Sequence, residues 1–441
     1  MQNFTEGAIA RQLGSFAFPI VLSSLLQVSM QLINSLWVGN LLGSEAFGAV
    51  TVGSLLMMLV LAFVIGLNHA TLTIFAQLRG RGDVEAIRSY LSTFVIILGL
   101  FAAAIGLVGY IFADTLLALL NTPEALVAEA RIYLQINFAG TVLLVGYNFI
   151  STVLRAFGDS KTPLYFILLA VVLTAVLTPL FIGVLGLGVA GAALALVAAQ
   201  ATAFIYSLFY LNNKFPGHGF RLQKPKWGEM DTILRLGIPS GVQMIVIQAG
   251  ITVILSLVNS LGADAVAGFG AAQRLDSIIL LPAVAMGMAV TAMAAQNIGS
   301  QQWLRVAQIA KIGVIYNTLI MSLIAVVLFI WAEPLIRLFI QDDASVGFGI
   351  SYLKTIAFFY PFIGLNFIFN SVVRSAGAMF QVLMLNIISL WLLRVPLAYW
   401  ATSVYGENGV ALGIGTSFVI SAVFSYAYYR WGGWRRKKLF K

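Results

Sequence analysis

The sequence of 441 residues contains no cysteine, so disulfide bonds and thiolate metal sites are excluded. It contains only two histidines, His69 and His218, which lie far apart in the chain. These absences leave no metal cluster and no His-based catalytic constellation. Charged residues make up only 9% of the chain, whereas soluble domains carry about 25%. Most of the protein surface therefore does not face water.

Phosphate-binding loops of the GxxxxGK[ST] type are also missing, which argues against ATP-driven pumping. We predict that the protein is not an enzyme and needs no cofactor. The net charge of +9 could suggest nucleic-acid binding. The placement of the basic residues at the ends of apolar segments indicates a membrane protein instead, with lipids as partners and no nucleic acid.

Hydrophobic residues account for 60% of the chain and gather in long runs. About 20 apolar residues cross the hydrocarbon core as a helix, and open sheets cannot span it. The first run follows a polar start and is too long for the core of a signal peptide, so we count it as a span. The sequence predicts an all-α integral membrane protein with twelve transmembrane helices, near residues 13–38, 47–77, 89–112, 132–154, 163–184, 187–211, 233–260, 266–296, 308–332, 350–373, 379–403 and 409–430.

Basic residues predict the orientation of these spans. If the spans alternate, 20 of the 25 lysines and arginines fall on the side of the N-terminus, three on the other side and two within spans. Positive residues gather on the cytoplasmic side of membrane proteins. We therefore predict a multi-pass protein of the inner (plasma) membrane with both termini in the cytoplasm.

The longest polar stretch, residues 212–230, divides the chain into near-equal parts. We predict an N-lobe at 1–211, a cytoplasmic linker at 212–230, and a C-lobe at 231–441 with a basic cytoplasmic tail. The parts repeat at an offset of 219: Leu42-Gly43 matches Leu261-Gly262, and Tyr133-Leu134 matches Tyr352-Leu353. Six spans in each part make this a parallel repeat, with two six-helix bundles related by a pseudo-two-fold axis and substrate bound between them.

Several motifs resemble those of the multidrug and toxic compound extrusion (MATE) family, in a bacterial, DinF-like branch. Residues 155–163, RAFGDSKTP, are similar to the family's loop after the fourth span. Further similar segments are Pro179–Ile182 with Gly186–Ala195, Ala271-Ala272-Gln273 followed by Pro282, and Arg394–Tyr399. The match covers essentially the whole chain.

This resemblance implies a V-shaped fold of two lobes that rock against each other. It also implies a monomeric secondary antiporter that exports amphipathic organic compounds, usually cationic, in exchange for H⁺ or Na⁺. A lipid or lipid-linked precursor flippase of the same superfamily is the alternative, because Arg274 and Arg394 outnumber the one acid inside a span and would suit an anionic headgroup.

The chain departs from the family at its N-lobe cation site. The positions that often carry Asp, Asn and Asp are occupied here by Asn34, Thr174 and Thr178. A proton carrier needs a titratable group, and Asn and Thr do not titrate. The coupling group is therefore expected elsewhere in the chain.

Ion-coupling candidates remain in the C-lobe: Asp276, Arg274 and Arg394. Asp276 is the only acid inside a predicted span, and a charge at mid-bilayer costs roughly 2.5–3.5 kcal/mol. From the outer ends of their spans, Asp276 lies about 17 Å deep and Arg394 about 14 Å deep. We hypothesise that Asp276 pairs with Arg394, and that Arg274, at i,i+2, faces elsewhere. Such a pair would serve either ion coupling or helix packing alone.

Proline residues within the spans suggest where the lobes bend. Pro19 in the first span matches Pro239 in the seventh at an offset of 220. Proline removes a backbone hydrogen bond and permits a kink. We hypothesise that bending at Pro19 or Pro239 gates a lobe.

Overall fold

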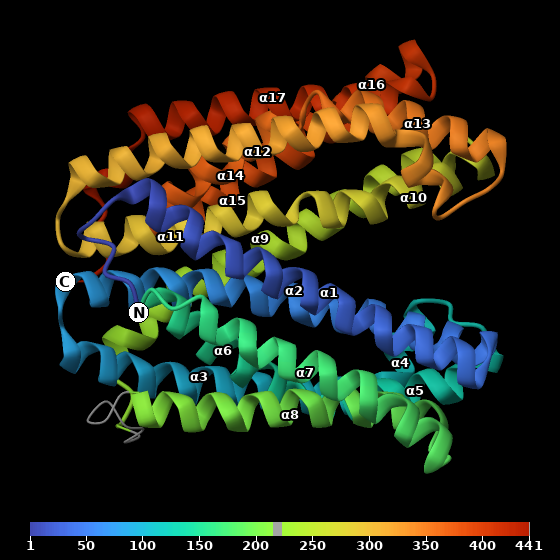
Figure 1. Ribbon diagram of the computed structural model, residues 1–441, viewed down its shortest axis with the longest axis horizontal. Coiled ribbons are helices and arrows are strands. Elements are labelled where there is room, and N and C mark those ends of the chain that lie inside the picture. The colour runs from blue at the N-terminus through green and yellow to red at the C-terminus, as the bar shows by residue number, and fades with distance from the viewer. Residues whose placement is uncertain (215–222, 441) are drawn as a thin grey trace. The chain divides into compact units, whose positions relative to one another are not determined.

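The computed structural model describes residues 1–214 and 223–440, and the predicted linker at 212–230 lies partly outside them. Figure 1 shows helices and connecting turns throughout the described residues. The first half of the chain contains α1 (Ile9–Leu42), α2 (Ser44–Arg81), α3 (Val84–Ile111), α4 (Ala113–Leu119), α5 (Glu124–Ala139), α6 (Thr141–Ala156), α7 (Lys161–Pro179), the π-helix η1 (Leu180–Val184) and α8 (Gly188–Lys214).

The second half repeats this order with more interruptions. It contains α9 (Trp227–Asn259), α10 (Ala263–Ile279), α11 (Leu281–Gly299), α12 (Trp303–Arg337), α13 (Asp343–Ala357), α14 (Tyr360–Ser375), α15 (Met379–Ile387), the π-helix η2 (Ile388–Arg394), α16 (Val395–Tyr405), α17 (Asn408–Trp431) and the 3₁₀ turn η3 (Gly433–Arg436).

Ten helical segments among the described residues are long and apolar enough to cross a membrane. Two bent pairs raise the number to twelve: α5 with α6, at 47°, and α13 with α14, at 52°. The predicted all-helical membrane fold with twelve spans is confirmed, with two of the spans broken. Proline explains the second break, because Pro361 stands in the first turn of α14, where its missing N–H costs no helical hydrogen bond.

The described chain separates into two compact units. Unit 1 comprises residues 1–2 and 22–237, and unit 2 comprises residues 3–21 and 238–441. The first part of α1 thus belongs to unit 2, whereas the predicted lobes assigned it to the N-lobe. The first part of α9 likewise belongs to unit 1. Pro19 and Pro239 each stand within three residues of the point where their helix passes from one unit to the other.

Within unit 2, α14 packs between α12 and α17, and α16 packs closely along α17 (Figure 1). Small residues allow this last contact. A Cβ atom at Gly409 would lie 2.1 Å from the Ala401 carbonyl oxygen, and one at Gly413 would lie 2.4 Å from the Ala398 Cα. Membrane helices approach closely where such residues meet, because dispersion contacts drive their packing in lipid.

The outward faces of the helices are apolar. On α12, the side chains of Leu319, Leu323, Val326 and Ile330 are 55–66% exposed and recur at helical spacing. Such a stripe would be unfavourable in water, where large exposed apolar patches are rare, but it suits contact with acyl chains.

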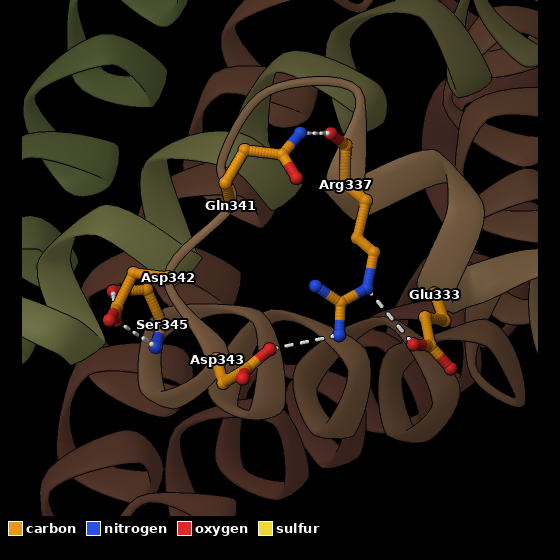
Figure 2. Close-up of polar contacts among 6 residues, drawn as sticks. All are labelled: Glu333, Arg337, Gln341, Asp342, Asp343 and Ser345. Atoms are coloured by element: carbon orange, nitrogen blue, oxygen red, sulfur yellow. Dashed lines mark hydrogen bonds and ion pairs between the residues drawn. The ribbon is translucent and has the colours of Figure 1, made fainter.

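A polar turn connects α12 to α13 at one end of unit 2 (Figure 2). The Arg337 guanidinium donates to Glu333 and to Asp343, both at 3.0 Å. Asp342 caps α13 by accepting from the Ser345 backbone N–H at 3.0 Å and from its hydroxyl at 2.9 Å. This surface network fixes where α13 begins, and α13 carries one residue of the site described next.

Candidate functional site

Asp276 lies on α10 in unit 2, and two tyrosines bind its carboxylate. The Tyr360 hydroxyl, from the start of α14, donates a hydrogen bond to Asp276 Oδ1. Tyr352, from α13, also hydrogen-bonds this carboxylate. Both tyrosines are buried in the core of unit 2, beside Phe269 and Leu353. The break between α13 and α14 therefore brings two phenols from one bent span to a single acid.

Arg394 does not pair with Asp276. Its Nε donates to the Ser417 Oγ at 3.1 Å, and its guanidinium carbon lies 4.8 Å from the centre of the Phe418 ring. It interacts electrostatically with the Tyr352 hydroxyl. All ion pairs among residues 1–214 and 223–440 involve other groups, so the predicted Asp276–Arg394 ion pair is wrong. Tyr352 interacts electrostatically with both charges.

Arg274 projects from a different face of α10, as its i,i+2 spacing from Asp276 predicts. Its side chain is exposed, and its guanidinium carbon lies 5.9 Å from the centre of the Phe339 ring in the turn after α12. The three charged candidates therefore have three different environments, and only Asp276 and Arg394 share a neighbour.

In unit 1, the corresponding family positions form a neutral, buried cluster. The Thr178 hydroxyl donates to Asn34 Oδ1 at 3.2 Å, and both residues are at most 1% exposed. The Thr174 hydroxyl instead donates to the Ala170 carbonyl on its own helix at 2.8 Å. Tyr133 hydrogen-bonds Asn34 as well as Ser54. The structure thus brings Asn34 and Thr178 together.

The repeat relates the two clusters through tyrosine. Tyr133 and Tyr352 match at the offset of 219, so each unit places a buried tyrosine beside one polar side chain: an amide in unit 1 and a carboxylate in unit 2. In the sequence this match indicates duplication, and it did not predict that either tyrosine contacts a polar site residue. A repeated tyrosine in an apolar span was the available signal, since a buried phenol needs a hydrogen-bond partner.

The site has a single acidic group. Among the residues that the structure describes, no group of three His, Cys, Asp or Glu side chains could hold a metal ion. One carboxylate with two phenol donors can accept and release a proton, or hold a monovalent cation. The prolines proposed as gates, Pro19 and Pro239, lie within α1 and α9.

Comparison with known proteins decides the family. The MatE family model matches the chain twice, over residues 19–180 and 239–400. The chain belongs to the MatE family. The two matches also confirm the internal repeat, because they are displaced by 220 residues. Members of this family are multidrug efflux transporters and not enzymes.

Curated relatives agree with this assignment. The chain is 51% identical to the "Probable multidrug resistance protein YpnP" of Bacillus subtilis (strain 168), with 99% of this chain and 98% of the relative aligned. It is 23% identical to the "Probable multidrug resistance protein NorM" of Thermotoga maritima, over 97% of this chain and 94% of the relative.

Solved structures share the MatE fold. The Vibrio cholerae MATE transporter VcmN in its bent form superposes with a TM-score of 0.92 at 22% identity, covering 98% of this chain and 99% of that chain. A MOP superfamily transporter from Pyrococcus furiosus gives a TM-score of 0.90 at 22% identity, with coverage of 97% and 96%. At this level of identity the likeness concerns the fold alone.

Proposed function

We propose that this MatE transporter is a proton-coupled antiporter that exports amphipathic, cationic organic compounds, with Asp276 as the proton carrier. One observation carries the proposal: the acid inside a span is bound by two tyrosines and not by an arginine. An ion pair would hold the carboxylate ionised. Neutral phenol donors stabilise the ionised carboxylate less than an arginine would, so the acid can take up a proton when an organic cation departs.

A proton needs fewer partners at this site than a metal cation does. Metal cations such as Ca²⁺ and Mg²⁺ take six or more oxygen ligands, usually from several carboxylates and carbonyls. The site offers one carboxylate and two phenol oxygens. A proton needs only one titratable group within hydrogen-bonding reach of its donors and acceptors.

The cationic groups on the neighbouring elements have other partners. Arg394 interacts electrostatically with Tyr352, which hydrogen-bonds the Asp276 carboxylate. Arg274 points to another face of α10, and Lys354 is exposed, with its Nζ 5.5 Å from the centre of the Phe329 ring. In the part of the chain that the structure describes, Arg274, Lys354 and Arg394 therefore leave the carboxylate without an ion pair, which suits a group that must take up a proton.

The orientation predicted from the basic residues completes the proposal. The protein would lie in the plasma membrane as a monomer, with both termini in the cytoplasm, and would exchange external protons for internal substrates. The relatives bear multidrug resistance names, so the comparisons do not favour the lipid flippase.

Efflux of a fluorescent organic cation from proteoliposomes tests the proposal. Wild-type protein should drive efflux under a pH gradient, and Asp276→Asn should reduce the rate at least about 100-fold, because an amide cannot carry the proton. Tyr360→Phe should shift the pH dependence of efflux while preserving transport, since it removes one donor to the carboxylate.

Asp264→Asn is the matched control, because Asp264 lies on the same helix but is exposed in its first turn. It should transport normally. Undiminished proton-driven efflux by a folded Asp276→Asn variant would exclude Asp276 as the carrier. Efflux driven only by a sodium gradient would contradict the proton assignment, and gradient-independent scrambling of lipid would indicate the flippase.

A further inference from the structure

Helix α17 presents a row of buried hydroxyl groups to the interior of unit 2. Ser417, Ser421 and Ser425 recur every four residues and are 0–3% exposed. Residues spaced by four lie on one helix face, so the row spans about 12 Å along the helix. Within lipid, buried polar residues are costly and usually form hydrogen bonds or serve function.

Partners from other helices face this row at each level. At one end, Ser417 accepts from Arg394 Nε at 3.1 Å. In the middle, the Ser421 hydroxyl shares a hydrogen bond with the Ser389 hydroxyl of η2. At the other end, the Ser425 hydroxyl donates to Asn370 Oδ1 of α14 at 3.2 Å.

The polar groups continue beyond the serines along α14. The Asn370 side-chain amide donates to Asn366 Oδ1. Arg374 follows Asn370 by about one helical turn and ends α14 in its last turn. We call Ser417, Ser421, Ser425, Ser389, Asn370 and Asn366 the hydroxyl track. It begins at Arg394, which shares Tyr352 with Asp276, and ends close to Arg374.

Simple helix packing does not require this arrangement. Ser417 and Ser421 already donate to backbone carbonyls of their own helix, at 2.6 and 2.5 Å, as isolated serines in membrane helices do. Their oxygens remain able to accept, and each meets a donor from another helix. Ser421 and Ser425 are separated by about 6 Å of helix rise, so a proton passing between their hydroxyls requires a bridging water molecule.

Unit 1 lacks a corresponding row. Aligning Gly188-Val189-Ala190 with Gly409-Val410-Ala411 places Leu196, Gln200 and Phe204 opposite the three serines. Within the described residues, the serine row of α17 in the unit that holds Asp276 thus has no match at the corresponding positions of α8.

We propose that the hydroxyl track is a hydrated path along which protons pass between Asp276 and the end of unit 2 at which α14 terminates, next to Arg374. Hydroxyl groups and water both donate and accept, so together they can pass a proton along the file. Arg394, Asn370 and Asn366 orient these groups and do not carry the proton themselves. The inference rests on the proposed function, since it supplies the route by which the carrier discharges its proton.

Thiol accessibility tests the path without reference to transport, because the native chain has no cysteine. In membranes, Ser421→Cys and Ser425→Cys should react with methanethiosulfonate ethylammonium at least about tenfold faster than Ala422→Cys, since only a hydrated thiol ionises and reacts. Ala422 is a suitable control because it is equally buried, at 5% exposure, and adjacent in the helix. Equal, slow modification at all three positions would overturn the hydrated path.

Transport provides the second readout. Ser421→Ala and Asn370→Leu should slow pH-driven efflux about tenfold. Equilibrium binding of the fluorescent cation should stay unchanged in both variants. Ser421→Thr, which keeps a hydroxyl group, should transport at the wild-type rate. Thr416→Val, on the exposed face of the same helix, should have no effect. Unchanged rates in folded Ser421→Ala and Asn370→Leu proteins would overturn the inference. A wild-type protein that shows no proton-driven efflux would instead overturn the proposed function, whatever the pattern of thiol modification.

Discussion

At the scale of single residues, the structure corrects the predicted partner of Asp276. Counting residues from the ends of the two spans gave similar depths in the membrane for Asp276 and Arg394. Such a count estimates the depth of a residue in any straight helix. Depth does not determine the rotation of a helix about its own axis, and rotation decides which side chains meet. Tyr352 and Tyr360 come from a broken span, so no helical spacing counted from one residue could have placed both beside Asp276.

A second acid, Asp342, provides a pH-dependent prediction at the same scale. The hydrogen bond from the Ser345 backbone holds the pKa of Asp342 below its ordinary value of 3.8. A lowered pKa in the folded state stabilises the cap fully above pH 3.8, and this contribution is lost as the pH falls through the folded value. The first turn of α13 should therefore loosen in acid.

Amide hydrogen exchange at Ser345 measures this effect, relative to the intrinsic exchange rate at each pH. Protection should fall as the pH drops below about 4. Asp342→Ala should show low protection at every pH, whereas Glu333→Ala should keep the wild-type pattern because it leaves the cap intact (Figure 2). Protection that does not vary with pH in the wild-type protein would contradict the cap assignment.

At the scale of helices, the apolar runs predicted the twelve spans because lipid leaves the backbone no alternative to the helix. The interruptions were not predicted. The bends between α5 and α6 and between α13 and α14 lie inside continuous apolar runs, and so do the π-helices η1 and η2. Hydropathy does not reveal bends or π-helices, because a broken helix and a straight helix place the same apolar residues in lipid.

Close packing of α16 and α17 gives a prediction about stability. Gly413→Ala would place its Cβ against backbone atoms of Ala398, at 2.4 and 2.7 Å, so the two helices must separate. Overpacking of this kind costs about 1–3 kcal/mol. The apparent melting temperature in detergent should fall accordingly.

The control for this change is Gly99→Ala on α3, where an added Cβ would meet no atom within 4 Å. Alanine is favoured over glycine within a helix by up to about 1 kcal/mol, so this variant should melt at the same temperature or higher. A Gly413→Ala protein as stable as Gly99→Ala would show that the α16–α17 contact tolerates separation.

At the scale of the whole molecule, α1 and α9 each belong to both units, and each has a proline next to the point of change. If the helices bend there during transport, Pro19→Ala and Pro239→Ala should slow efflux several-fold, because alanine restores a backbone hydrogen bond that stiffens the helix. Efflux kinetics in proteoliposomes measure this. Pro334→Ala, near the end of α12, serves as a control for the loss of a proline within a helix. Wild-type rates in both test variants would argue against gating at these positions.

The same division of α1 sets an order for synthesis. Phe4 is fully buried in unit 2, where its amide donates to Gln296 and its carbonyl accepts from Asn297 and Arg305. Phe4 and Gln296 are separated by 292 positions. At about 5–20 residues per second, the ribosome needs roughly 15–60 s to bridge that gap. The N-terminal segment around Phe4 therefore lacks these partners until most of the chain has been synthesised and inserted. Unit 2 folds around a segment that is made before the helices of unit 1.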